Sequence, residues 1–231
     1  MRQEDFTPTN TPFELSKYED PYQVRRVSIL ADLIPAGNGR LAVDIGCGPG
    51  YFSKHLVDKK WLTTSIDTDP ENIKSTSRFS QETRLGDAIS TLQSFPEGKF
   101  DFALMLELIE HMPKEYGTKL LEQVIRTLKP GGQLLISTPN RHSLEGLSGR
   151  IWEMRGAGKW TAWDKTHVYI YSGGEFISFL TQCGFKVEKV VGYYYQGDFP
   201  LIGSVKLPIE KSETFPLNRL GFNIMLQCTK A

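Results

Sequence analysis

The spacing of hydrophobic and polar positions changes several times along the chain, and each change marks a predicted element. Between residues 23 and 34 the apolar side chains recur at helical spacing, and the proline and glycines that follow end that helix. From residue 41 onward, short apolar runs of strand length alternate with amphipathic segments of helical period. The pattern predicts strands at 41–45, 61–66, 83–85, 100–106 and 133–137, and helices at 51–59, 70–78 and 119–128.

This alternation predicts an α/β fold in which helices cover both faces of a parallel sheet. Beyond residue 138 the alternation stops, and a tryptophan-rich stretch follows that we expect to form an inserted lid. A helix over 172–182 and strands over 185–195 and 220–229 complete the predicted elements. We expect one domain over 1–231, made of an N-terminal arm and helix (1–35), a core (40–138), the lid (139–171) and a C-terminal part (172–231) with a substrate loop near 196–218.

Composition removes several classes of protein. The 231 residues carry 27 Lys and Arg against 27 Asp and Glu, which argues against a strongly basic nucleic-acid coat protein. No apolar run approaches the roughly 20 residues that cross a bilayer, and the N-terminus lacks the apolar segment of a signal peptide. Cys47, Cys183 and Cys228 are too far apart for a disulfide framework or a thiolate metal site. We therefore expect a cytoplasmic protein with no membrane partner.

A glycine-rich turn follows the first predicted strand, in the run Asp44-Ile-Gly46-Cys-Gly48-Pro-Gly50. Glycines let a ligand approach the backbone closely, and the start of the next helix offers free N–H groups. A dinucleotide fingerprint needs a small residue at the sixth position, where this chain has Tyr51. The acid two residues before the first glycine favours a ligand with a cationic amino group. A tight turn without a ligand is the alternative.

Acidic residues also follow the next two predicted strands. Asp67 ends the second strand, where a carboxylate can accept both hydroxyls of a ribose, and Asp87 follows the third, where it could accept from an adenine amino group. Asp67 could instead cap the helix that follows, although Asp69, beside Pro70, is the better capping candidate. Ligands of open parallel sheets bind beyond these carboxyl ends of the strands, so the acids and the glycine turn predict one site.

Two further motifs complete the set, namely Glu107-Leu-Ile-Glu110-His111 after the fourth strand and Lys129-Pro-Gly-Gly before the fifth. In their order, the five motifs resemble those of the class I S-adenosylmethionine-dependent methyltransferases. The resemblance covers about residues 40 to 140. It implies a Rossmann-like, seven-stranded, mostly parallel sheet that closes with a C-terminal antiparallel hairpin, and it leaves the methyl acceptor open.

The same resemblance implies a set of residues that hold S-adenosylmethionine. The glycines would pass under its methionine part, with Asp44 near the ammonium, and Asp67 would hold the ribose diol. Arm residues Tyr18 and Arg25 would close over the cofactor. The full set of expected cofactor-binding residues is Asp44, Gly46, Cys47, Gly48, Gly50, Asp67, Thr68, Asp87, Ala88 and Leu106.

His111 is the expected catalytic base. The methyl group of a sulfonium is already activated, so the protein mainly positions the reactants and excludes water. A hydroxyl acceptor also needs a base, and imidazole titrates near neutral pH. The alternative is that His111 packs at the start of a helix and binds only the backbone.

A metal site is a second hypothesis for the same motif. Glu107, Glu110 and His111 stand at positions i, i+3 and i+4, which share one face of a helical turn, and His142 or His167 could add a ligand. The pattern resembles that of ubiquinone-pathway O-methyltransferases and of plant small-RNA 2′-O-methyltransferases, which implies Mg²⁺. The alternative is a solvated helix start that binds no ion.

The sequence thus predicts a methyltransferase that acts on a small-molecule acceptor, most readily at a hydroxyl, with aromatic lid residues as walls for that acceptor. Methylation of RNA ribose or of nitrogen is the alternative within the class, although no separate RNA-binding module is visible and we expect no nucleic-acid partner. Outside the class, the alternatives are a nicotinamide-dependent oxidoreductase and a non-catalytic cofactor-binding subunit. The expected wall residues are Trp152, Trp160, Trp163, Tyr169 and Tyr171.

Overall fold

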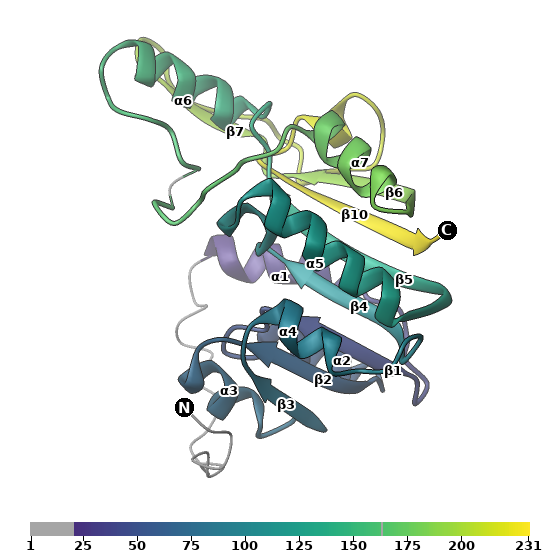
Figure 1. Ribbon diagram of the computed structural model, residues 1–231. Helices are drawn as coiled ribbons and strands as arrows, with labels where there is room; N and C mark the ends of the chain where they lie inside the picture. The colour runs from purple at the N-terminus through teal and green to yellow at the C-terminus, as the bar shows by residue number, and fades with distance from the viewer. Residues whose placement is uncertain (1–20, 163) are drawn as a thin grey trace. The chain divides into compact units, whose positions relative to one another are not determined.

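The computed structural model of the chain describes residues 21–162 and 164–231 (Figure 1). Tyr18 and Trp163 lie outside the described residues, as does the side chain of Arg25. Backbone contacts divide the chain into two units. The first comprises Met1–Met105 and Arg126–Gly132, and the second comprises Leu106–Ile125 and Gln133–Ala231.

The first unit is built on parallel strands in the order β3-β2-β1-β4. Each connection between these strands contains a helix, which is the arrangement that the alternating pattern predicts. The strands are β1 (Leu41–Ile45), β2 (Leu62–Asp67), β3 (Glu82–Leu85) and β4 (Phe100–Leu106), and the helices are α1 (Pro21–Leu33), α2 (Tyr51–Asp58), α3 (Pro70–Thr76) and α4 (Ala88–Gln93).

The Lys-Pro-Gly-Gly motif has a structural function in this unit. The Lys129 ammonium binds both oxygens of the Asp101 carboxylate, at 2.8 and 2.9 Å, and Asp101 also accepts the Leu41 N–H at 3.1 Å. Asp101 thereby ties the start of β1 to the start of β4, and these contacts hold the pKa of its carboxyl below the usual value even though burial opposes them.

The second unit is built on antiparallel strands. The C-terminal strand β10 pairs with β5 on one side and with β6 on the other, which confirms the predicted antiparallel hairpin. Its strands are the part of β5 (Leu128–Pro139) from Gln133 onward, β6 (Phe185–Tyr193), β7 (Gln196–Phe199), β8 (Gly203–Lys206), β9 (Lys211–Ser212) and β10 (Asn223–Lys230). Its helices are α5 (Lys114–Thr127), α6 (Leu144–Met154) and α7 (Gly173–Gln182), with 3₁₀ turns η3 (Ile109–His111) and η4 (Leu217–Arg219).

The structure differs from the prediction mainly around residues 196–218. Instead of a simple loop, β7 and β8 form a separate hairpin, and β9 pairs with β6. The short strand β9 therefore adds one strand to the predicted seven. Its two residues are too few to show a hydrophobic period, so the pattern could not reveal it.

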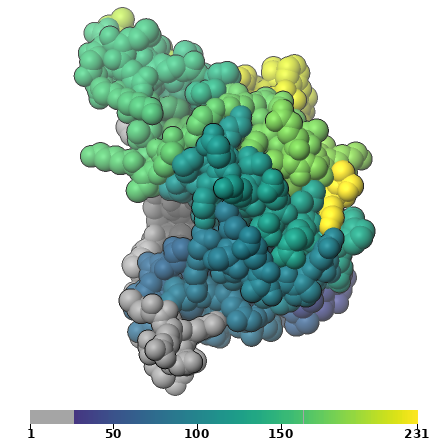
Figure 2. All heavy atoms as spheres, in the orientation of Figure 1, coloured from purple at the N-terminus to yellow at the C-terminus, as the bar shows by residue number. Residues whose placement is uncertain are grey.

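Helix α6 fills the first half of the predicted lid and packs against β7. Ser143 caps it by accepting the Gly146 N–H at 2.9 Å. Heavy atoms of α6 lie at the surface in the space-filling view (Figure 2). Met154 of α6 and Leu201 of the β7–β8 turn are exposed apolar side chains. Within the described residues, no helix has both the length and the apolar character that a bilayer crossing requires.

Candidate active site

In the first unit, the glycine turn between β1 and α2 is docked on the end of β2. The N–H groups of Gly46 and Cys47 both donate to the Ile66 carbonyl, at 2.9 and 3.0 Å. The Gly48 N–H donates to Oδ2 of Asp67 at 2.8 Å. The turn and the Asp67 carboxylate therefore form one hydrogen-bonded assembly, as a preformed ligand site requires.

The glycines of this turn have different physical functions. Gly50 has a φ of +93°, and a Cβ there would lie 2.4 Å from Thr76 Oγ1 and 2.5 Å from the Phe79 ring, so this glycine permits packing on the α3 segment. Gly48 has a φ of +53°, but a Cβ there would meet nothing within 4 Å. The turn is thus open at Gly48, where an extended ligand can approach the backbone.

Asp67 is held by donors on both carboxylate oxygens. Besides the contact with Gly48, its Oδ1 accepts the Asp69 N–H at 2.8 Å and the Asn72 side-chain amide at 3.2 Å. Asp69 caps α3 through the Glu71 N–H, as the sequence predicts, so Asp67 is not needed as the cap. The sequence did not predict a function for Asn72, because it belongs to no motif. Its position in the first turn of α3 brings its side chain to Asp67.

Asp44 is buried in the first unit and accepts the Ser53 hydroxyl at 2.6 Å. Burial raises the pKa of Asp44 to about 7, the Ser53 hydrogen bond opposes this rise, and the Asp67 charge adds to it. A carboxyl in this environment is ionised at neutral pH only in part. A ligand ammonium beside it would hold it ionised, because an opposite charge favours the charged form.

The pKa of Asp44 leads to a pH prediction. From about pH 4 to pH 7, the range between the unfolded and the folded pKa, the folded chain holds a proton on Asp44 that the unfolded chain has released. The Asp44 contribution to the free energy of unfolding therefore falls as pH rises through this range. Asp44→Asn removes this loss. The free energy of unfolding of the variant, measured relative to the unmodified chain, should therefore rise by on the order of 2 kcal/mol from pH 5 to pH 8. Urea unfolding at both pH values measures the gain, and an equal difference at both would contradict the prediction.

The other expected cofactor residues lie at the ends of strands and helices or in the loops between them. Asp87 is exposed and caps α4 through the Ser90 N–H at 3.0 Å, so it has a structural function in addition to the expected one. The Cys47 side chain is buried and its thiol lies 3.8 Å from Thr76 Oγ1, so Cys47 offers a ligand its backbone only. Burial raises the pKa of this thiol and keeps it protonated. The remaining three are Thr68, which is exposed after β2, Ala88, which begins α4, and Leu106, which ends β4.

In the second unit, the turn η3 and the segment that follows Thr161 form a cluster of acids and imidazoles. The Glu110 carbonyl accepts the N–H groups of Val168 and Tyr169, at 2.8 and 3.0 Å. The His111 and His167 rings meet edge to face with centroids 4.8 Å apart, and His167 Nε2 lies 3.9 Å from Oε1 of the buried Glu110. Backbone hydrogen bonds thus hold together residues that are more than 50 positions apart in the sequence.

The hydrogen bonds of this cluster favour one neutral tautomer of each imidazole. The Thr166 hydroxyl donates to Asp164 Oδ1 at 2.6 Å, so its oxygen accepts from His111 Nδ1 at 2.9 Å. These hydrogen bonds hold the pKa of Asp164 below its usual value. In the neutral form of His111 this hydrogen bond places the proton on Nδ1 and leaves the lone pair on Nε2. His167 likewise donates from Nδ1 to the Thr161 carbonyl at 2.7 Å, and desolvation lowers its pKa.

The predicted metal ligands are only partly brought together. Ligand atoms of Glu110, His111 and His167 lie within 4.8 Å of one another. Glu107 instead accepts the Ser137 hydroxyl at 2.6 Å and the Asn223 amide at 2.7 Å. His142 is exposed and does not belong to the cluster found among the described residues.

The chemistry of these donors does not favour the expected ion. Mg²⁺ prefers a shell of oxygen ligands, whereas two of the three donors here, from His111 and His167, are imidazole nitrogens. Imidazole suits ions of the transition series. The residues present therefore do not fit the expected Mg²⁺.

The lid aromatics divide between core and surface. Tyr171 is fully buried and stacks on Phe179, so it belongs to the core and cannot form a wall for a substrate, as the sequence had suggested. Trp152 is more than one-third exposed and donates from its indole nitrogen to the Asp198 carbonyl at 2.8 Å, which anchors α6 on β7. Trp160 and Tyr169 line a pocket of the second unit.

Comparison with known proteins identifies the family. A sequence family described as a methyltransferase domain matches residues 24–190. A ubiquinone biosynthesis O-methyltransferase from Psychrobacter arcticus is 25% identical over 169 residues, which are 68% of this chain and 63% of that protein. The protein of the same name from Xanthomonas axonopodis pv. citri is 29% identical over 181 residues, which are 75% of this chain and 73% of that protein. The match thus leaves more than a quarter of each relative uncovered.

A solved structure shows the same fold. The crystal structure of a SAM-dependent methyltransferase from Archaeoglobus fulgidus superposes with a TM-score of 0.66 at 21% identity, over 94% of this chain and 97% of that one. This confirms the predicted Rossmann-like fold with its mostly parallel sheet. The chain belongs to the class I S-adenosylmethionine-dependent methyltransferase superfamily. A nicotinamide-dependent oxidoreductase, which was one alternative, is thereby set aside.

Proposed function

We propose that this chain transfers a methyl group from S-adenosylmethionine to a hydroxyl of a small-molecule acceptor. The observation that carries the choice of oxygen is the hydrogen-bond chain from Asp164 through Thr166 to His111, which leaves the lone pair on His111 Nε2. A hydroxyl needs such a base because it attacks poorly while protonated. The names of the related ubiquinone biosynthesis O-methyltransferases support the same choice.

The residues of the first unit would bind and orient the cofactor. Asp67, already held by Gly48 and Asn72, would accept the ribose hydroxyls, and Asp44 would face the ammonium. The open side of Gly48 would take the methionine part. When bound, S-adenosylmethionine supplies an activated methyl group on a sulfonium.

The residues of the second unit would handle the acceptor. His111 Nε2 would take the hydroxyl proton, and the ionised Asp164 would stabilise the resulting imidazolium through Thr166. Thr166 and Asp164 are positioning residues, since they act only through His111. The cluster therefore has the arrangement of a general base, His111, whose orientation is fixed by a further group, Asp164.

A metal ion would exclude this function of His111, because one lone pair cannot both bind a metal and accept a proton. We expect the chain to keep its methyltransferase activity after exhaustive treatment with a chelator, with metal content checked by elemental analysis. Loss of activity that Mn²⁺ or Zn²⁺ restores would contradict the base and identify Glu110, His111 and His167 as metal ligands. Glu110→Gln further distinguishes the base from the metal site, because at a metal site this substitution should abolish the restoration of activity by added metal.

Nucleic acid and membrane are not needed for this function, and a cytoplasmic location stays a prediction from the free thiols of the three cysteines.

The experiment that tests the proposal is a methyltransferase assay with tritiated S-adenosylmethionine against a panel of hydroxylated and aminated small molecules. We expect transfer to hydroxyls. Exclusive transfer to amines, or to RNA ribose, would contradict it.

A further inference from the structure

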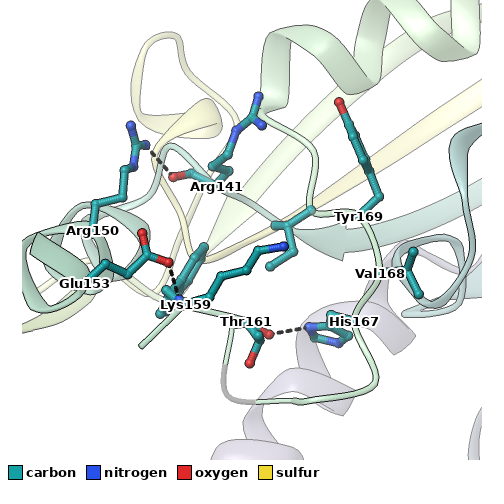
Figure 3. Close-up of a pocket in the computed structure, with 10 residues that line it drawn as sticks. Arg141, Arg150, Glu153, Lys159, Thr161, His167, Val168 and Tyr169 are labelled. Carbon is teal, nitrogen blue, oxygen red and sulfur yellow. Dashed lines mark hydrogen bonds between the residues drawn. The ribbon is translucent and has the colours of Figure 1, made fainter. Parts of the chain in front are cut away.

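The second unit contains a pocket of about 280 Å³ between α6 and residues 159–161 and 167–170 (Figure 3). Arg141 and Arg150 line one side of it, and His167 and Tyr169 line another. Lys159 extends across its middle in the close-up. The volume is just below the roughly 300–1,000 Å³ of most small-molecule sites, so it suits one ring or the polar end of a longer molecule.

The charges that line this pocket are unbalanced. Its one acidic lining residue, Glu153, already accepts the Trp160 N–H, and Arg141 pairs with Glu175 at 3.1 Å. Among the described residues, Arg150 donates a hydrogen bond only to the Arg141 carbonyl, at 2.8 Å. In the part of the chain that the structure describes, neither Arg150 nor Lys159 has a carboxylate within ion-pair distance, so two of the cations that line the pocket have no ion-pair partner.

Packing of α6 holds these cations in place. A Cβ on Gly149 would lie 2.3 Å from the Trp160 ring, and one on Gly146 would lie 2.2 Å from the Arg141 carbonyl oxygen. The two glycines therefore let Trp160 lie directly on the helix, which places the neighbouring Lys159 beside the pocket. The nearby His142 has a lowered pKa, from desolvation and then from the charges of Arg150 and Arg141.

We infer that this pocket binds an anionic group of the methyl acceptor, a carboxylate or a phosphate ester, through Arg150 and Lys159. The inference rests on the proposed function and narrows it to hydroxylated organic acids. The same pocket is lined by His167, whose ring contacts His111, so an acceptor anchored by its anion would extend toward the base. A guanidinium and an ammonium are the side chains that recognise such anions.

Binding of defined probes to the full chain tests this inference. The probes are 3,4-dihydroxybenzoate, its neutral counterpart catechol, and phenyl phosphate, measured by ligand-observed NMR with S-adenosylhomocysteine present. We expect 3,4-dihydroxybenzoate to bind about tenfold more tightly than catechol. Arg150→Gln and Lys159→Gln should each remove most of that difference. The control Arg155→Gln changes an exposed cation just after α6 that does not line the pocket, and it should preserve the difference.

Each outcome decides between the sources of the anion or against the inference. Tighter binding of phenyl phosphate than of dihydroxybenzoate, lost in both glutamine variants, would support it and identify a phosphate ester. Equal affinity for catechol and dihydroxybenzoate, or equal losses in the Arg155→Gln control, would overturn it. So would a single-stranded RNA that outcompetes every small probe. Titration of S-adenosylhomocysteine into the same samples reports separately on the proposed function, because the expected cofactor acids lie in the other unit.

Discussion

Asp67→Ala should weaken the binding of S-adenosylhomocysteine by at least about 100-fold. Two hydrogen bonds from ribose hydroxyls to a carboxylate are worth roughly 1.5–3 kcal/mol each, and every 1.4 kcal/mol is tenfold in affinity. The substitution also removes the acceptor for the Gly48 N–H, which loosens the glycine turn. Isothermal titration calorimetry of the purified chain measures the effect.

Asp69→Ala is the matched control for this experiment. Asp69 lies two residues away and caps α3, so its loss should cost about 1 kcal/mol of stability while binding changes little. Thermal unfolding of both variants separates loss of the site from loss of the fold. Unchanged affinity in a folded Asp67→Ala chain would show that Asp67 does not bind the cofactor. It would also show that the contact of the glycine turn with Asp67 is not needed for cofactor binding.

His111→Ala should lower kcat for a hydroxyl acceptor by about 10²- to 10⁴-fold, the usual contribution of a general base. Binding of S-adenosylhomocysteine should be unaffected, because the expected cofactor acids belong to the first unit. The measurement is a steady-state assay on the acceptor found by the panel. A variant with near-normal kcat would show that His111 only packs against its neighbours.

Thr166→Val tests the positioning of the same base. Valine keeps the shape of threonine but breaks the link between Asp164 and His111, so the His111 ring can adopt either tautomer. We expect kcat to fall by about tenfold with little change in KM, and nitrogen NMR should show a mixture of tautomers. A single Nδ1–H tautomer in the variant would contradict the relay. Asp164→Asn should resemble Thr166→Val, since each variant leaves His111 without a hydrogen-bonded link to an ionised carboxylate.

Much of the fold could be predicted because the first half of the chain is locally consistent. The strands at 41–45 and 100–106 have the predicted bounds, since each is a buried apolar run between polar or glycine residues. The pattern did not predict helices α4 and α6. The six residues of α4 are too few to show a helical period, and the glycines in α6 obscured its period. Strand β5 begins five residues earlier than predicted, since the Lys-Pro-Gly-Gly turn is continuous with it.

The sequence by itself determined the order of the motifs, the glycine turn and the acids after successive strands, because each depends on neighbours along the chain. The tertiary structure alone decided that Glu107 binds Ser137 and Asn223, and that Thr166 orients His111 across 55 positions. It also gathered Arg150 and Lys159 around one pocket. Hydrogen bonds and charges act over a few ångströms in space, and only folding brings residues that are distant in the sequence within that range.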